Sequence, residues 1–179
     1  MRSGLAAIIV CLILTGSTTA AVPRPAAAAS NLRSPSIPAA RRITAAKVTM
    51  LALINAERAR AHVGTLHLDA ALNAIAQARS QDMIARHYFS HHIPGGGMVF
   101  DILDRHHVAY EMAGENIALN NYIDFYSMAQ TVRQTNTDLM NSPEHRANIL
   151  ESKYAKIGLG MAFEKSSGKL VVTEVFVQT

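Results

Sequence analysis

The hydrophobic residues of this chain change their spacing along the sequence, and this change limits the folds that the chain can adopt. In residues 69–87, one face of a helix is outlined by residues that recur at spacings of three and four: Leu72, Ile75 or Ala76, Arg79 and Met83. We expect this helix to begin after Asp69 as N-cap and to end near residue 87. Near the C-terminus, residues 156–163 and 169–177 flank the turn sequence "EKSSG", and the β-branched residues of 169–177 predict a β-hairpin. Helices followed by a late antiparallel sheet indicate an α+β fold built in layers.

Local signals divide the rest of the ordered chain into further helices and turns. They predict helices over residues 44–63, 99–107, 124–141 and 142–150. Gly64 is the expected C-cap of the first of these helices. The last begins at "SPEHRANIL", with Ser142 as N-cap and Pro143 in the first turn. The three consecutive glycines at 95–97 predict a turn or mobile loop.

The N-terminal residues have the organisation of a secretory signal peptide. Residues 1–20, "MRSGLAAIIVCLILTGSTTA", combine a charged start, an apolar run and small residues before Ala20. The apolar run covers residues 5–14, which is far short of the roughly 20 residues of a membrane span. We therefore predict export to the cell envelope or the extracellular space and no stable membrane insertion of the mature protein. Residues 21–43, rich in Ala, Pro and Ser, are expected to form a flexible linker before a domain over 44–179.

Cysteine content and charge exclude several functions. The single cysteine, Cys11, lies in the predicted signal peptide, so the mature protein has no disulfide and no thiol nucleophile. A domain of about 135 residues buries enough surface to be stable without disulfides. Lysines and arginines are scattered, with Arg41 and Arg42 as the only adjacent pair, so a nucleic-acid partner is not indicated. We expect a monomer.

Three polar pieces stand within otherwise apolar sequence: "YFSHH" at 88–92, "GENIA" at 114–118 and "NSPEHRANIL" at 141–150. The motifs of zinc peptidases, serine hydrolases, P-loop proteins and dinucleotide-binding proteins are absent. In this order and spacing, the three pieces resemble the CAP family, the SCP-like extracellular domain, in its bacterial branch. The resemblance covers roughly residues 44–178. It implies a three-layer α-β-α sandwich with a central antiparallel sheet and a surface cavity lined by histidines and acidic residues.

The resemblance also implies which residues line that cavity. Carried over position by position, the two histidines are His91 and His145, and the first glutamate is Glu115. A second family glutamate corresponds to Ser142, so the set is reduced to three residues. Two imidazoles and one carboxylate suit Zn²⁺ or another divalent metal with an open coordination position. The alternative is that the three side chains only hydrogen-bond to one another.

Two further residues are candidates for a supporting role around the cavity. Glu174 shares a strand face with apolar residues, which is unfavourable for a charge without a partner. It either supports the cavity or lies at the edge of the sheet. Asn116, next to Glu115, is expected to brace the backbone. His87 and His92 are expected to belong to a helix end and a solvated loop.

The resemblance supports a secreted ligand-binding module whose cavity holds a lipid, a peptide or a cell-wall fragment, with metal binding as an accessory. The alternative is a hydrolase of peptides or esters, in which a metal held by His91, Glu115 and His145 lowers the pKa of a bound water. Its weakness is the serine at position 142, where a general base would stand. A third alternative is an interaction domain without a functional cavity.

Overall fold

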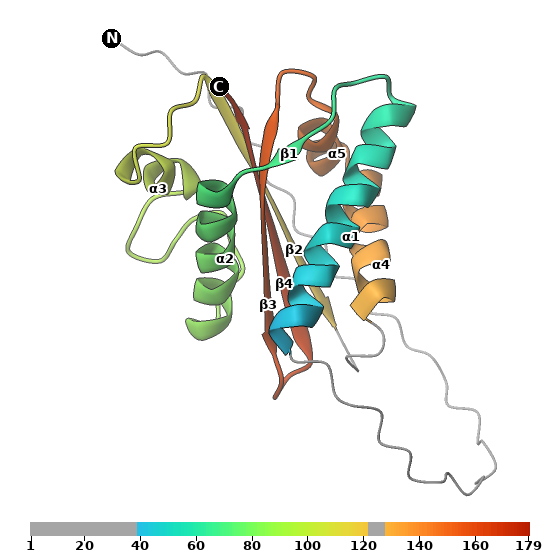
Figure 1. Cartoon of the computed structure of the whole chain (residues 1–179). Coiled ribbons are helices and arrows are strands. Elements are labelled where there is room, and N and C mark those ends of the chain that lie inside the picture. The colour runs from blue at the N-terminus through green and yellow to red at the C-terminus, as the bar shows by residue number, and fades with distance from the viewer. Residues whose placement is uncertain (1–38, 122–127) are drawn as a thin grey trace, which may run out of the picture.

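The protein folds into three layers, with one β-sheet between two layers of helices (Figure 1). The computed structural model describes residues 39–121 and 128–179. Its elements, in chain order, are α1 (Ala39–Arg60), β1 (His67–Leu68), α2 (Ala70–Ala85), α3 (Val99–Arg105), β2 (Met112–Asn121), α4 (Met128–Asn141), α5 (Pro143–Leu150), β3 (Lys156–Glu164) and β4 (Lys169–Gln178). Helices α2 and α3 cover one face of the sheet, and α1, α4 and α5 cover the other. This arrangement confirms the α-β-α sandwich.

The sheet has the strand order β1-β3-β4-β2. Strands β3 and β4 form the predicted hairpin, and β2 pairs antiparallel with β4 along its whole length. Among the described strands, only the two-residue β1 runs parallel to its neighbour, β3. Strand β2, which carries "GENIA", is therefore an edge strand, whereas β4 lies in the interior of the sheet.

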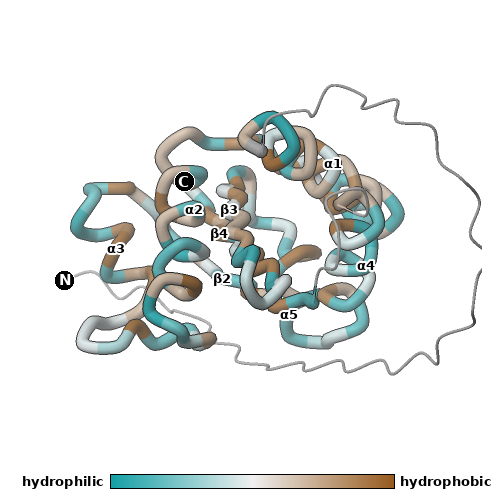
Figure 2. The backbone as a smooth tube through the Cα atoms, turned by 90° about the horizontal axis from the view of Figure 1, so that it is seen from below, coloured by the Kyte–Doolittle hydropathy of each residue, from teal (hydrophilic) through white to brown (hydrophobic). Residues whose placement is uncertain are grey.

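Both faces of the sheet are apolar, and each supports its own core. Figure 2 shows the strands as a narrow row between the two helical layers. On the side of α1, α4 and α5, Met50 and Ile54 pack with Phe176. On the side of α2 and α3, Leu72 packs with Val175. Because side chains alternate along a strand, neighbouring residues of β4 enter opposite cores.

Helix α2 packs unusually close to β3 because two glycines leave room for its backbone. A Cβ atom on Gly158 would lie 2.2 Å from the backbone of Leu72, and one on Gly160 would lie 2.0 Å from the carbonyl oxygen of Ala76. The same helix covers the open edge of β3, since Gln77 bonds to both the N–H and the carbonyl of Met161. This contact blocks the pairing of another strand at that edge.

Three helices end on a histidine in the left-handed conformation, where glycine is usual. His62, His87 and His107 have φ values of 58°, 54° and 53° and follow α1, α2 and α3. At each end, two backbone hydrogen bonds form a Schellman motif. The prediction that Gly64 caps α1 is therefore wrong, because the left-handed residue comes two positions earlier. A non-glycine residue in this conformation costs about 1 kcal/mol.

Several predicted boundaries differ from the structure or lie outside it. The predicted signal peptide, 1–20, and residues 21–38 of the predicted linker are outside the described residues. Residues 39–43 of that linker are helical, because α1 begins at Ala39. The long helix predicted from residue 124 is described from Met128 onward as α4. None of the helices within the described ranges combines the length and the apolarity that crossing a bilayer requires.

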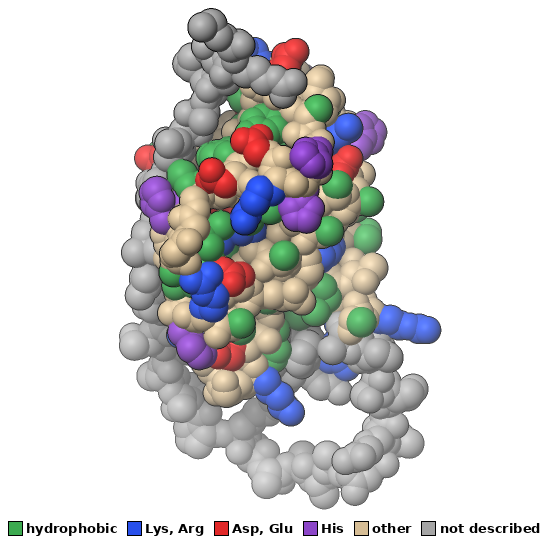
Figure 3. Space-filling view, turned by 90° about the vertical axis from the view of Figure 1, so that its left-hand side faces the viewer, with side chains coloured by type: hydrophobic (Ala, Val, Ile, Leu, Met, Phe, Trp, Pro, Cys, Tyr) green, Lys and Arg blue, Asp and Glu red, His purple; other side chains and the backbone are tan. Residues whose placement is uncertain are grey.

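The face formed by α2 and α3 carries charges of both signs. Acidic, basic and histidine side chains are interspersed there with apolar ones (Figure 3). This face therefore has no patch of a single charge.

Candidate functional site

Helix α5 places His145 on its buried side. Ser142 has the extended backbone of an N-cap and Pro143 occupies the first turn, as predicted. The Ser142 hydroxyl bonds to the Glu144 carboxylate instead of capping the helix backbone. His145 is 2% exposed. The Ser142 hydroxyl thus makes its hydrogen bond within its own helix turn.

Glu115 on β2 and His91 in the loop after α2 are in direct contact. His91 Nδ1 lies 2.8 Å from Glu115 Oε2, and both side chains are buried. The imidazole tautomer with its proton on Nδ1 donates this hydrogen bond and leaves Nε2 as an acceptor. Glu115 therefore orients the His91 ring.

Arg79 on α2 completes this contact and was missed as a site residue. Its Nε donates to Glu115 Oε1 at 2.9 Å, and the side chains of the pair are 1% and 2% exposed. The guanidinium also donates to the Tyr88 hydroxyl at 2.6 Å and to the Ser90 carbonyl at 3.0 Å. Burial alone would lower the pKa of Arg79, but Glu115 and Tyr88 outweigh it, and the pKa is raised. The sequence signal that could have identified Arg79 is the presence of an arginine within the apolar stripe of a predicted helix.

His145 approaches the same region from the other helical layer. Burial lowers its pKa, the nearby His91 lowers it further, and Glu144 partly opposes these effects. Neither ring nitrogen of His145 has a hydrogen-bond partner among the described residues, and the same holds for His91 Nε2. The structure thus leaves two buried imidazoles with unused nitrogens.

A buried amide network holds the backbone at His145. Asn116 Nδ2 donates to the His145 carbonyl at 3.1 Å and to Glu174 Oε2 at 2.9 Å. Asn148 on α5 donates to Asn116 Oδ1 at 2.9 Å. Asn116 therefore links β2, β4 and α5. This agrees with its predicted bracing of the backbone.

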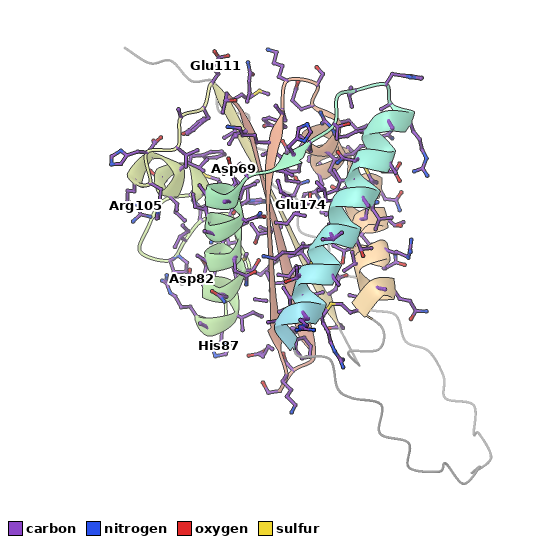
Figure 4. All side chains as sticks on the ribbon, viewed as in Figure 1. Asp69, Asp82, His87, Arg105, Glu111 and Glu174 are labelled. Atoms are coloured by element: carbon purple, nitrogen blue, oxygen red, sulfur yellow. The ribbon has the colours of Figure 1, made fainter. Side chains whose placement is uncertain are left out.

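Glu174 lies inside the protein, between the sheet and α1 (Figure 4). Its strand, β4, has neighbours on both sides, so the alternative of a position at the edge of the sheet is excluded. Burial raises the pKa of Glu174 to about 7, although the hydrogen bond from Asn116 opposes the shift. Its Oε1 atom has no partner in the described part of the chain.

The cavity beside His145 is small. It has a volume of about 20 Å³ and is lined by Phe89, Ile117, Leu119 and Leu139, among others. A volume of this size accommodates about one water molecule. A larger ligand can insert one small group here while its body remains outside.

The donor set for a metal is smaller than the three residues of the resemblance. Across residues 39–121 and 128–179, no group of three or more His, Cys, Asp or Glu side chains is placed to hold a metal ion. Both oxygens of Glu115 are already hydrogen-bonded, to Arg79 and His91. The nitrogens that remain available are those of His91 and His145. Two imidazoles fit a zinc-type ion that takes its other ligands from solvent or a bound molecule, but they are one ligand short of a catalytic zinc site.

Comparison with known proteins identifies the family. The sequence profile of the CAP family, described as the cysteine-rich secretory protein family, matches residues 51–179. The chain belongs to the CAP family. The match covers all four strands of the described sheet and includes the three cavity residues. It confirms the resemblance carried by the three polar pieces.

Relatives and solved structures agree with a bacterial CAP domain. The uncharacterized protein YkwD of Bacillus subtilis (strain 168) is 35% identical over 118 residues, which are 66% of this chain and 43% of YkwD. A crystal structure of an extracellular protein with an SCP domain from Bacillus anthracis (strain Ames) has a TM-score of 0.62 and 26% identity, over 82% of this chain and 45% of that protein. The chain thus spans less than half the length of these two proteins.

A more distant CAP structure was solved with a metal. NaASP2, crystallised with Zn²⁺, has a TM-score of 0.52 and 13% identity, over 73% of this chain and 78% of its own. At this identity, the similarity concerns the fold alone.

Proposed function

We propose that this CAP-family protein is a secreted ligand-binding module that acts at the cell envelope or in contact with a host or the environment. The observation that carries the proposal is the set of unused nitrogens on His91 and His145. A buried polar atom without a partner costs about 1–3 kcal/mol. A bound group that supplies the missing hydrogen bonds or a coordinate bond would remove this cost.

A divalent metal such as Zn²⁺ is the accessory that suits these nitrogens best. Burial lowers the pKa of His145, so its imidazole is neutral and able to coordinate at neutral pH. Carboxylates commonly accept a hydrogen bond from a metal-binding histidine and so fix its tautomer. Glu115 can do the same for His91, because it accepts the hydrogen bond from Nδ1 and leaves Nε2 free to coordinate. The bound ion would supply a Lewis acid with coordination positions open to oxygen atoms of a ligand.

The size of the cavity favours a peptide or a cell-wall fragment over a lipid. A space of about 20 Å³ beside His145 takes a hydroxyl, an amide group or a water molecule but not an acyl chain. The polar groups of a peptide or glycan would reach the imidazoles while the rest of the ligand lies on the surface.

The hydrolase alternative has less support. Zinc sites that activate a bound water have three protein ligands. Here the Glu115 carboxylate is hydrogen-bonded to Arg79 and His91, so it is not available as the third ligand. The serine at position 142 bonds to Glu144. We expect no hydrolysis of peptides or esters beyond that of a variant lacking both cavity histidines.

Zinc titration of the mature protein tests the proposal. We expect His91→Ala and His145→Ala each to weaken Zn²⁺ binding about tenfold or more, because each removes one of two nitrogen ligands. His92→Ala is the matched control, since His92 is exposed and adjacent to His91 in sequence. Equal Zn²⁺ affinity in wild type and both cavity variants would contradict the metal part. A titration with a soluble peptidoglycan fragment, with and without Zn²⁺, then tests the ligand.

Asn116 and Glu174 are proposed to position His145 without contacting the ligand. Asn116→Ala removes the hydrogen bonds to the His145 carbonyl and to Glu174 Oε2. We expect Zn²⁺ binding to weaken about tenfold, the usual effect of losing a supporting hydrogen bond behind a metal ligand. The imidazole signals of His145 in an NMR spectrum should broaden or shift in this variant. Unchanged signals together with unchanged affinity would contradict this role.

Export is part of the same proposal. The n-region, the apolar run and the small residues of 1–20 support removal of a signal peptide after secretion. The mass of the protein recovered outside the cytoplasm should correspond to a chain that begins after Ala20 or within the following alanine-rich stretch. Recovery of the intact chain from the cytoplasm alone would contradict export.

A further inference from the structure

We propose that the protein has a second ligand site, separate from the imidazole cavity, which takes a small amphipathic carboxylate: an aromatic ring or a short acyl chain that bears a carboxylate group. The site is a pocket of about 150 Å³ between the C-terminal end of α2, the loop that follows it, the end of β2 and the β3–β4 hairpin. Its lining combines the apolar side chains of Met83, Ile84, Phe89 and Leu119 with those of His87, Tyr88, Glu164 and Lys169.

The floor of the pocket is apolar and partly open to water. Met83 is buried, and Ile84, Phe89 and Leu119 are partly buried members of the same small hydrophobic cluster. The volume of the pocket is sufficient for a benzene-sized group. Covering the exposed part of this apolar surface with a ligand ring is favourable at about 25 cal/mol per Å² of buried area. The floor therefore selects the apolar part of the ligand.

Of the two charged residues in the lining, Glu164 and Lys169, only Lys169 offers a charge without a protein partner among the described residues, and this charge is complementary to a carboxylate. Glu164 is engaged within the protein, because the Ser167 hydroxyl donates to its Oε2 atom and His87 Nδ1 lies 3.8 Å from its Oε1 atom. Lys169, the cross-strand neighbour of Glu164, is exposed and makes no side-chain hydrogen bond or ion pair within the described ranges. An exposed ammonium group beside an apolar pocket binds an anionic ligand group.

The pocket is distinct from the cavity beside His145. Phe89 and Leu119 line both spaces, but none of the three cavity residues lines the larger pocket. Figure 4 places His87, another lining residue of the larger pocket, at the end of α2 that lies level with the β3–β4 hairpin. A ligand in the pocket therefore need not contact the imidazoles.

Binding of three isosteric probes to the full-length mature protein tests the site. The probes are phenylacetate, 2-phenylethylamine and 2-phenylethanol, which share the ring and differ in charge. We expect phenylacetate to bind with a dissociation constant of roughly 1–10 mM, as is usual for a ligand of this size, and to shift the NMR signals of residues around Leu119 and Lys169. The amine and the alcohol should bind about fivefold more weakly, the effect of losing one exposed ion pair.

Two lysine variants separate the proposed contact from general charge effects. Lys169→Gln should weaken phenylacetate binding about fivefold, whereas Lys169→Arg should restore most of it. Lys165→Gln, on the same hairpin but outside the pocket lining, should change binding by less than about twofold. The proposal is overturned if the amine binds as well as the acid, if both glutamine variants lose affinity equally, or if no probe shifts the pocket signals. Unchanged phenylacetate binding in His145→Ala would support a site independent of the proposed zinc function.

Discussion

Glu174→Gln should change the dependence of stability on pH. Glu174 is fully buried, and burial raises its pKa from 4.5 to about 7. Below about pH 4.5 the carboxyl is neutral in both the folded and the unfolded chain, and it contributes no penalty. As pH rises toward 7, the unfolded chain releases the proton first, so the folded state loses stability. Above the folded pKa the loss is complete.

The size of this loss follows from the pKa shift. Each unit corresponds to about 1.4 kcal/mol, so a rise from 4.5 to about 7 costs the folded state about 3 kcal/mol at alkaline pH. Glutamine has the same shape and no charge, and its side-chain oxygen can still accept the hydrogen bond from Asn116. The free energy of unfolding of Glu174→Gln, relative to wild type, should therefore rise by about 3 kcal/mol between about pH 4 and about pH 8.

Urea unfolding followed by circular dichroism measures this difference, because the chain has no tryptophan for fluorescence. Comparing the two proteins at each pH cancels all other titrating groups. Glu111→Gln is the matched control, since Glu111 is exposed at the start of β2 and its substitution should change stability by no more than about 0.5 kcal/mol. A difference between Glu174→Gln and wild type that stays constant across this pH range would refute the reasoning.

Three further predictions concern packing, charge burial and helix ends. Gly158→Ala should lower the free energy of unfolding by about 3 kcal/mol or more, because its Cβ would collide with the α2 backbone. Gly64→Ala has open space around it and should leave the free energy of unfolding unchanged or raise it by up to about 1 kcal/mol, as urea unfolding of both variants can show. Arg79→Ala should lower the free energy of unfolding by about 3–5 kcal/mol, because it leaves the buried Glu115 carboxylate without its ion-pair partner. Arg86→Ala removes only the exposed ion pair with Asp82 and should cost no more than about 1 kcal/mol, so equal losses in thermal unfolding would count against an effect of charge burial. His107→Gly should raise stability by about 0.5–1 kcal/mol, since glycine adopts the left-handed conformation without strain; a lower melting temperature would disprove this.

The helical and strand elements were largely predictable because their signals are local. The N-cap at Asp69, the helix start at Ser142 and the β3–β4 hairpin depend on residues within a few positions of one another, and the structure confirms all three. The predicted C-cap at Gly64 failed for a tertiary reason. Arg58 is buried and donates to the Gly64 carbonyl and to carbonyls after α5, and these contacts help to fix where the chain leaves α1.

The resemblance to the CAP family supplied the three cavity residues, but the sequence did not indicate how they are used. The His91–Glu115 hydrogen bond joins a loop to an edge strand, and Arg79 joins this pair from a helix that precedes both. The spacing within each motif carries no information about contacts between motifs. The hydrogen bond from Asn148 to Asn116 could not be inferred for the same reason, since the two residues lie on different elements.

The sequence thus determined the elements, their order and the residue types available for a site, because helix and strand periodicities are properties of neighbouring residues. Only the packing of the three layers decided which polar groups became buried together. Burial, and not residue type, sets the pKa of Glu174 at about 7 and lowers that of His145. From the sequence, the Glu115 carboxylate could equally have faced a metal. The packing of α2 against the sheet instead places Arg79 in contact with it. Electrostatic properties of this kind depend on the distance between distant segments and on the exclusion of water, which exist only in the folded chain.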